Sequence, residues 1–388
     1  MKKKTLNKAT RSVFQTKSKP HGVLLKSDWT QFEQRKKDHI RLALDPRAQA
    51  AVPTSVDQLE LKLDGLPDLN FNEISLDTTA LNRPVSSPLF ISSMTAGHSQ
   101  GDRINELLAE FSHDKQILFA VGSLRRELTD HSLRKKWRLL KSKYPKALFI
   151  GNLGVSELVQ RGVDDVLSLI EGFGGLGFYI HWNSLQEIIQ PEGSPNFRGA
   201  MDKIGALVKR SSCPILIKEV GCGLSADNVM RLSDLGVAAV DLAGVGGTHW
   251  GRVEGFRAGK GTLRERTAQT FENWGVSNVR TLLDLYNLNV DCQLWASGGI
   301  RQGLDAAKMI SAGAQMVGVA QPWMRAIMGS SKGSIRIHRG AYEALVNTFD
   351  IFQYELRTSL FCTGSKNLSE LRGKFEKVRR YEIVRTDF

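Results

Sequence analysis

Residues 176–187 read LGFYIHWNSLQE, and this stretch decides how the remainder of the chain is interpreted. Apolar side chains at Leu176, Phe178 and Ile180 lead into it, as they do in a strand that is buried on both faces. Four polar side chains follow, close enough in sequence to face one space beyond the strand end: His181, Asn183, Gln186 and Glu187. Taken alone, the stretch is equally compatible with a helix N-terminus that carries incidental polar residues.

Apolar runs of this kind recur from residue 88 onward, separated by glycine-rich turns and helical patterns. The predicted strands are Leu89–Met94, Phe119–Ser123, Leu148–Leu153, Leu176–Trp182, Ile215–Val220, Ala238–Ala243, Gln293–Ser297 and Met316–Ala320. Segments whose apolar residues recur at helical intervals lie between them, for example Arg103–Gln116, Val163–Phe173, Ala226–Leu235 and Leu304–Ala312. Strands that alternate with helices in this number predict an α/β fold, a (β/α)8 TIM barrel. A doubly wound sheet is the alternative, but it usually has fewer strands, and no GxGxxG follows the first strand.

The chain is expected to divide into four parts. Residues 1–27 are rich in Lys, Ser and Thr without an apolar period, which predicts a flexible basic N-terminal arm. Residues 28–87 are predicted to form an N-terminal helix and lid segment, with helical spacing from Trp29 to Ala51. Residues 88–330 form the barrel, and residues 331–388 a C-terminal helical extension.

The composition excludes several classes of protein. The 388 residues, 41% of them hydrophobic, can bury a sizeable core. No apolar run approaches the ~18 residues of a membrane span, and the N-terminus lacks the apolar segment of a secretory signal. Without a CxxC pair, the cysteines indicate reduced thiols and a cytoplasmic protein, not a disulfide framework or a zinc site. The four cysteines are Cys213, Cys222, Cys292 and Cys362.

The net charge of +13 is concentrated near the N-terminus, where residues 1–47 hold 13 Lys/Arg and 4 Asp/Glu. A basic arm can contact nucleic acid, but this one lacks interleaved aromatics and a recognisable binding module, so no nucleic-acid partner is expected. The run Arg35-Lys36-Lys37-Asp38-His39-Ile40 packs cations and a histidine into less than two helical turns. A solvated helix face is one interpretation, and a clamp for a multiply charged phosphate is the other.

Catalysis in such a barrel occurs at the carboxyl ends of the strands. Nearly all of the predicted strands have a polar or glycine residue at this end. The strand ends read Ser93 to Gly97, Gly122 to Arg125, Gly151 to Gly154, His181 to Glu187, Lys218 to Gly221, Gly244 to Thr248, Ala296 to Arg301, and Ala320-Gln321.

Two glycine-rich loops on this rim are candidates for phosphate binding. The run Ser297-Gly298-Gly299-Ile300-Arg301 precedes a helix, so backbone N–H groups and the helix dipole favour an anion. The run from Gly244 to Thr248 supplies a second loop, and Ala320-Gln321 completes a place where barrels commonly bind phosphate. A tight turn without a ligand is the alternative.

Lys218, Asn152 and Thr95 end three other strands, and together they suit a flavin ring, because a cation near N1 stabilises its reduced anion. From about Arg35 to Gln321 the chain resembles the type 2, FMN-dependent isopentenyl-diphosphate isomerases. The resemblance rests on Arg35-Lys36-x-Asp38-His39-Ile40, Met94-Thr95, Gly122-Ser123-x-Arg125, Asn152-Leu153-Gly154, His181-x-Asn183-x-x-Gln186-Glu187, Gln190-Pro191-Glu192-Gly193, Lys218-Glu219-x-Gly221-x-Gly223, Gly246-Gly247-Thr248-x-Trp250 and Ser297-Gly298-Gly299-Ile300-Arg301.

The resemblance implies roles for particular residues. FMN is expected at Ser93, Met94, Thr95, Ser123, Asn152, Lys218, Thr248, Gly298, Gly299, Arg301, Ala320 and Gln321. The diphosphate is expected at Arg35, Lys36, His39, Ser123, Arg125, His181, Asn183 and Gln186. Gln186 and Lys218 are the expected catalytic residues, and Glu187 is the expected Mg²⁺ ligand. NADPH or another reductant is expected to reduce FMN, and the family implies a homo-oligomer, from dimer to octamer.

Four departures from the family pattern stand out. Ala96-Gly97-His98 replaces a Gly-Gly pair, which narrows the space expected beside the flavin. His249 replaces a small Ser, and Ser194 replaces an acidic residue. Gln321 replaces an Arg, which removes one cation from the expected FMN phosphate site and is expected to weaken FMN binding.

Moving the double bond of isopentenyl diphosphate needs a proton added at one carbon and removed from another. Gln186 does not titrate, Glu187 suits Mg²⁺ better, and Cys222 is the one thiol candidate. Reduced FMN is therefore expected to act as acid and base without net redox change. The alternatives are an FMN barrel oxidoreductase acting on a hydroxy acid or dihydro-substrate, and a nucleic-acid-binding protein that uses the basic arm.

Overall fold

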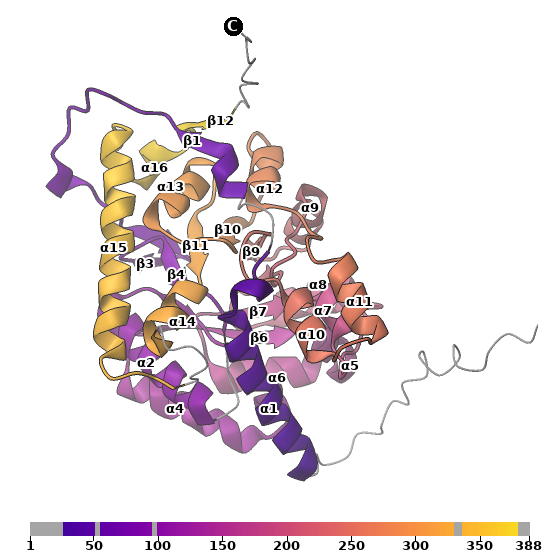
Figure 1. The fold of residues 1–388 in the computed structure, drawn as a ribbon. Coiled ribbons are helices and arrows are strands. Elements are labelled where there is room, and N and C mark those ends of the chain that lie inside the picture. The colour runs from indigo at the N-terminus through magenta and orange to yellow at the C-terminus, as the bar shows by residue number, and fades with distance from the viewer. Residues whose placement is uncertain (1–25, 51–54, 95–98, 330–335, 379–388) are drawn as a thin grey trace, which may run out of the picture.

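The computed structural model describes residues 26–50, 55–94, 99–329 and 336–378 (Figure 1). Its centre is a closed barrel of parallel strands, ordered β4-β5-β6-β7-β8-β9-β10-β11, in which β11 pairs with β4. Closure leaves no sheet edge, so the (β/α)8 prediction is confirmed and the doubly wound alternative is wrong. The strands are β4 (Leu89–Ile91), β5 (Leu118–Ala120), β6 (Leu148–Gly154), β7 (Gly177–His181), β8 (Ile215–Lys218), β9 (Ala239–Asp241), β10 (Gln293–Ser297) and β11 (Met316–Val319).

Helices surround this barrel and pack their apolar faces on it (Figure 1). The helices that follow its strands are α2 (Ser99–Lys115), α3 (Arg125–Thr129), α4 (Arg134–Lys143), α5 (Val155–Arg161), α6 (Val163–Phe173), α7 (Ser184–Ile189), α8 (Ala200–Arg210), α9 (Ala226–Ser233), α10 (Trp250–Arg257), α11 (Leu263–Thr270), α12 (Asn278–Leu285), α13 (Gly303–Ser311) and α14 (Gln321–Met328). The predicted helices correspond to α2, α6, α9 and α13, and their observed ends differ from the predicted ones by at most a few residues.

The barrel interior consists of two layers of different chemistry. Side chains of a strand that are two positions apart face the same side, so each strand contributes two successive inward-facing residues, which we assign to a lower layer and a polar layer. The lower layer is fully buried and consists of hydrophobic side chains, one of which carries a hydroxyl group. Its residues are Phe90, Ala120, Ile150, Tyr179, Leu216, Ala239, Trp295 and Met316. Two positions further along each strand lie Ser92, Gly122, Asn152, His181, Lys218, Asp241, Ser297 and Gly318. The interior therefore becomes polar within one layer, at the carboxyl ends of the strands.

A short hairpin closes the opposite end of the barrel. Strands β2 (Thr78–Ala80) and β3 (Arg83–Val85) pair in antiparallel fashion. Leu81 and Asn82 join them with φ angles of 50° and 61°, as a two-residue hairpin turn requires. Leu81 and Val85 pack with the lower layer of the barrel interior, so the hairpin plugs the barrel.

A segment near the C-terminus pairs with a segment that precedes the barrel in the sequence. The chain after the barrel is helical over α15 (Ala341–Cys362) and α16 (Leu368–Leu371). It then adds a strand that was not predicted, β12 (Phe375–Lys377), which pairs with β1 (Leu59–Leu61). The four-part division of the chain stays a prediction, and its first part, residues 1–27, lies almost wholly outside the described residues.

Helix α1 (Lys26–Ala43) lies at the open end of the barrel beside α10 (Figure 1). It ends earlier than the predicted Ala51, because a residue before proline disfavours helix and Asp45-Pro46 begins a separate 3-10 turn. The chain then bonds to the loop after β9: the Ala50 nitrogen donates to the Gly247 carbonyl at 2.7 Å. This connection fixes the C-terminal end of α1 over the barrel.

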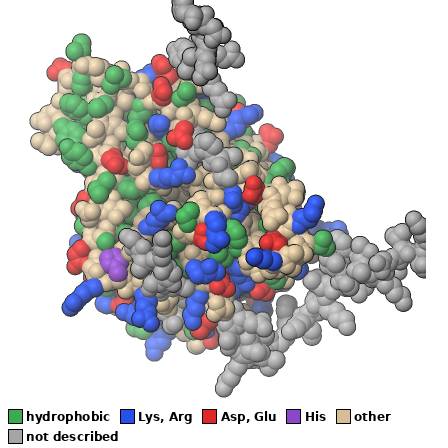
Figure 2. Space-filling model, in the orientation of Figure 1, with side chains coloured by type: hydrophobic (Ala, Val, Ile, Leu, Met, Phe, Trp, Pro, Cys, Tyr) green, Lys and Arg blue, Asp and Glu red, His purple; other side chains and the backbone are tan. Residues whose placement is uncertain are grey.

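Hydrophobic side chains gather on the surface over α15 and the nearby loop that follows β1 (Figure 2). Leu63, Leu66, Ile351 and Tyr354 are exposed there. Contiguous exposed apolar side chains commonly mark contact surfaces. Among the described helices, none combines the length and the apolar character that crossing a membrane requires.

Candidate active site

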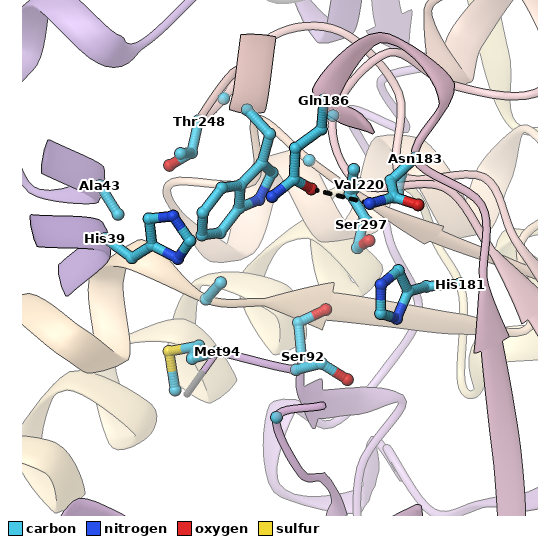
Figure 3. A pocket seen from close by; sticks show the side chains of 18 of the residues that line it. His39, Ala43, Ser92, Met94, His181, Asn183, Gln186, Val220, Thr248 and Ser297 are labelled. Carbon is cyan, nitrogen blue, oxygen red and sulfur yellow. Dashed lines mark hydrogen bonds between the residues drawn. The ribbon is translucent and has the colours of Figure 1, made fainter. Parts of the chain in front are cut away.

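One cavity at the carboxyl ends of the strands is lined by every predicted site residue that the structure describes (Figure 3). Thr95, predicted to contact FMN, lies outside the described residues, as do Ala96 and His98. The predicted residues on the cavity wall are Arg35, Lys36, His39, Ser93, Met94, Ser123, Arg125, Asn152, His181, Asn183, Gln186, Glu187, Lys218, Thr248, Gly298, Gly299, Arg301, Ala320 and Gln321. The structure therefore brings together residues separated by up to 286 positions in the sequence.

The two glycine loops pack directly against each other. Gly298 and Gly299 have φ angles of 93° and 78°, and a Cβ on Gly247 would lie 2.6 Å from the Gly299 nitrogen. Asn278, at the start of α12, fixes both loops: its side chain donates to the Ser297 carbonyl at 2.8 Å and accepts from the Gly244 nitrogen at 2.9 Å. Backbone this close, at a helix N-terminus, fits a phosphate group.

Side chains around these loops connect the barrel to α1. Arg301 donates through Nη2 to the Gly246 carbonyl at 2.9 Å. Gln321 donates to the Ala43 carbonyl at the end of α1 at 3.0 Å. The Gln321 amide thus tethers α1, and Arg301 is the cation beside the loops.

Lys218 is buried in the polar layer and donates through Nζ to the carbonyl of Glu219. Burial lowers the pKa of Lys218, while the carboxylates of Asp241 and Glu219 oppose that shift. The Glu219 carboxylate accepts the backbone N–H groups of residues 220–223. Burial nevertheless raises the pKa of Glu219 to about 6.

His181 is held in one tautomer. Asn152 donates through Nδ2 to the Val121 carbonyl at 3.2 Å, which leaves its Oδ1 to accept from His181 Nδ1 at 2.9 Å. Burial, with Lys218 and Lys36 nearby, lowers the pKa of His181 to about 3. The ring is therefore neutral and presents an Nε2 lone pair, so binding an anion there requires the ring to gain a proton.

The residues after β7 form a connected network. Asn183 donates through Nδ2 to Glu187 Oε1 at 2.8 Å and to Gln186 Oε1 at 3.2 Å, the bond drawn in Figure 3. The Ser194 nitrogen donates to Glu187 Oε2 at 2.6 Å. Gln186 in turn donates to Glu254 Oε1 at 3.3 Å. Both oxygens of Glu187 thus have a donor, and one lone pair on each remains for a cation.

Glu254, on α10, joins this network to α1. Its Oε1 lies 2.8 Å from His39 Nε2, and its Oε2 pairs with Arg257. Burial lowers the pKa of His39 to about 4, so the neutral ring donates to the carboxylate. Trp250 packs its ring against His39, with centroids 4.9 Å apart.

Arg35 and Lys36 of α1 lie near Arg125, the first residue of α3. Burial and then the neighbouring Arg125 lower the pKa of Arg35, and burial, Arg35 and Arg125 lower the pKa of Lys36 to about 7. Arg125 Nε lies 2.9 Å from Glu157 Oε1. An anion stabilises like charges that lie this close together, so this wall of the cavity fits a diphosphate.

Several residues of the site were missed from the sequence. Glu254 lies four positions after Trp250, on the same face of α10, and that spacing was the available signal. Glu157 follows the predicted Asn152-Leu153-Gly154 run but carries no pattern of its own. Asn278 and the buried Asp241 lie in ordinary strand and helix contexts, without a signal that sets them apart.

Cys222 does not line the cavity. Its Sγ lies 3.5 Å from His249 Nε2, and burial raises the pKa of the thiol well above its usual range. His249 caps the N-terminus of α10, accepting the Arg252 nitrogen. The suggestion that Cys222 serves as the acid is therefore not supported, and His249 has a structural role.

The carboxylates offer little to a metal on their own. Among the described residues, no three His, Cys, Asp or Glu side chains form a group that could hold a metal ion. Glu187 alone would need a ligand's oxygens to complete the coordination of Mg²⁺, which is common for magnesium bound through phosphates.

Comparison with known proteins agrees with this geometry. The FMN-dependent dehydrogenase family matches residues 182–377. "Isopentenyl-diphosphate delta-isomerase" of Bdellovibrio bacteriovorus is 43% identical over 349 residues, which cover 89% of this chain and 97% of that protein. The protein of the same name from Legionella pneumophila (strain Philadelphia 1) is 43% identical, over 90% of this chain and 99% of its own. A solved flavocytochrome b2 variant with pyruvate bound shares the fold, with a TM-score of 0.60, 15% identity, and coverage of 90% and 85%.

Proposed function

Because the chain belongs to the FMN-dependent, type 2 isopentenyl-diphosphate delta-isomerase family, we propose that it interconverts isopentenyl diphosphate and dimethylallyl diphosphate. The observation that carries the proposal is the division of one cavity into two walls. Glycine loops and Lys218 lie on the barrel side, and the cations Arg35, Lys36 and Arg125 lie on the α1 side. An oxidoreductase acting on a hydroxy acid would need only one or two cations for its carboxylate, so the α1 wall favours the isomerase.

The barrel wall fits FMN. The glycine loops and Arg301 would hold its phosphate, and Lys218 would lie at the ring. The hydroxyl oxygens of Ser92 and Ser93 are buried without a hydrogen-bond partner among the described residues, and a polar ligand would satisfy them. Reduced FMN, when bound, supplies groups that donate and accept protons. Lys218 would stabilise negative charge on that ring, and Asn152 holds His181 in one tautomer.

The α1 wall would bind the diphosphate. Arg35, Lys36 and Arg125, which line the cavity, would supply the positive charge. Glu187 would hold Mg²⁺ together with the phosphate oxygens, and Asn183 fixes the orientation of that carboxylate. His39 is bonded to Glu254, so its part is to secure α1 over the bound substrate.

Gln186 lies between Asn183 and Glu254, with a hydrogen bond to each. Because an amide does not titrate, Gln186 orients the carbon chain and does not itself supply the proton. We therefore assign Gln186 as a catalytic residue that orients the substrate. Lys218 is the second catalytic residue, because it would lie at the flavin ring.

NADPH or another reductant would keep FMN reduced, and its consumption would not follow turnover. The apolar surface over α15 supports a homo-oligomer, dimer to octamer, in which Leu63, Leu66, Ile351 and Tyr354 contact a second copy of the chain. Cytoplasmic location and the absence of a nucleic-acid partner stay predictions.

The test is an anaerobic assay with isopentenyl diphosphate, FMN, Mg²⁺ and dithionite. We expect dimethylallyl diphosphate to accumulate to equilibrium while flavin turns over without stoichiometric loss of reductant. One equivalent of reductant or oxidant consumed per product molecule would establish the oxidoreductase instead. An inactive, colourless protein would contradict both.

A further inference from the structure

Lys218 and Asp241 are neighbours in the polar layer of the barrel. They are partners in the parallel register of β8 and β9, so their side chains emerge side by side into the interior. Lys218 lines the cavity, whereas Asp241 lies behind it with no exposed surface. No sequence motif assigns a role to Asp241.

Asp241 is a buried carboxylate with incomplete hydrogen bonding. Its Oδ1 accepts from Ser297 Oγ at 2.7 Å and from the Ala243 nitrogen at 3.3 Å. Its Oδ2 is buried and has no hydrogen-bond partner among the described residues. No ion pair in the described part of the chain joins it directly to Lys218.

Glu219 provides the contrast. It also lies close to Lys218, but its carboxylate accepts four backbone N–H groups, which disperse its negative charge. Of the two carboxylates, Asp241 therefore keeps more of its field for Lys218. A buried ammonium without such a counter-charge tends to lose its proton, as burial lowers the pKa of Lys218.

We propose that Asp241 is a positioning residue that keeps Lys218 protonated and thereby sets the reduction potential of the bound flavin. The proposal rests on the proposed function in one respect, since it requires FMN beside Lys218. A positive charge at the ring favours the reduced, negatively charged flavin. Asp241 thus acts through Lys218 and touches neither flavin nor substrate.

The direction in which Asp241→Asn changes the reduction potential of the flavin distinguishes two roles for Asp241. If Asp241 keeps Lys218 charged, then Asp241→Asn costs the ring its cation, and the flavin potential becomes more negative. If Lys218 stays charged without help, the same substitution only removes a negative charge, and the potential becomes more positive. A purely structural Asp241 would leave the potential unchanged.

The experiment is a double-mutant cycle on the full-length FMN-loaded enzyme, with potentials measured by dye equilibration at fixed pH. We expect Asp241→Asn to move the potential most of the way toward the value of Lys218→Met, and we expect no further decrease in the double variant. Tyr179→Phe is the matched control, because it removes a buried hydroxyl of the same interior without changing charge, and its potential should equal that of the wild type. If the amide does not fold, Asp241→Ser removes the same charge with a smaller side chain.

An unchanged or more positive potential in a folded, yellow Asp241→Asn enzyme would overturn the inference. With an active wild type, that result would leave the isomerase function standing. A wild-type chain that binds no flavin would overturn both proposals.

Discussion

The two walls of the cavity differ in the charge that their polar groups carry. On the barrel wall the groups are paired in advance: Asn278 clamps both glycine loops, and Asn152 fixes the tautomer of His181. On the α1 wall, Arg35 and Lys36 lie near Arg125 with pKa values lowered by burial and by mutual repulsion. The first arrangement suits a resident cofactor, and the second gathers like charges that a bound anion would stabilise.

Replacing the central cation of the barrel wall should have the largest effect. We expect Lys218→Met to lower kcat by about 10²–10³-fold, the usual cost of removing a preorganised electrostatic partner. FMN content should change little, because the glycine loops and Arg301 remain. Steady-state kinetics and the absorbance spectrum measure both. A variant with normal kcat would show that the barrel wall works without this charge.

Removing a cation from the α1 wall should act on binding instead. We expect Arg125→Gln to raise KM for isopentenyl diphosphate by about 10–100-fold, as loss of a charge-assisted hydrogen bond implies. FMN binding should be unaffected. Arg138→Gln, on the exposed face of α4, is the matched control with an unchanged KM. Equal effects of both variants would mean that only the overall charge matters.

Lys36 should make binding depend on pH. In the free enzyme its pKa is about 7, so it is charged below that pH and neutral above it. A diphosphate prefers the charged form, so KM should rise as pH increases above about 7, by up to about tenfold per unit. In Lys36→Arg the rise should disappear, because Arg keeps its charge. A wild-type KM that is flat from pH 6 to 9 would contradict this.

The same lysine should lower the stability of the empty enzyme. Its lowered pKa means that the unfolded chain binds more protons between about pH 7 and 10.5, so the free energy of unfolding should increase with pH across that window. Below about pH 7 the full cost is present, so Lys36→Met should raise Tm at pH 6 while it weakens substrate binding. Thermal unfolding with and without inorganic pyrophosphate separates the two effects.

Cys222, outside both walls, should have the smallest effect. Cys222→Ala keeps the His249 cap and removes only a buried thiol, so kcat and KM should stay within about twofold of wild type. Loss of more than 100-fold in kcat without loss of Tm would restore the thiol as a candidate acid.

The sequence predicted the barrel wall far better than its surroundings. Short apolar runs that end in glycine and polar residues identify strands, and the two-residue period then places Lys218 and Asn152 at the mouth. The β2–β3 hairpin was missed because Arg83-Pro84-Val85 does not resemble a strand, and the β1–β12 pair because its strands are over 300 residues apart. The helical spacing up to Ala51 predicts too late an end for α1, because Pro46 begins a separate 3-10 turn.

Residues that act through a partner were the hardest to predict. Arg35, Lys36 and Arg125 could be recognised because clustered cations suggest an anion. The roles of Glu254 and Asp241 depend on what lies beside them, His39 and Gln186 in one case and Lys218 in the other. Such neighbours come from distant parts of the chain, and a single sequence does not show them.

The most direct test of a shared cavity is to titrate isopentenyl diphosphate, with Mg²⁺, into the FMN-loaded enzyme while recording the flavin absorbance. We expect a saturable shift of the flavin bands at wild-type affinity, and a shift that needs at least tenfold more substrate in Arg125→Gln. Calorimetric binding of the diphosphate with no change in the flavin spectrum would contradict the account, because cofactor and substrate would then occupy separate sites.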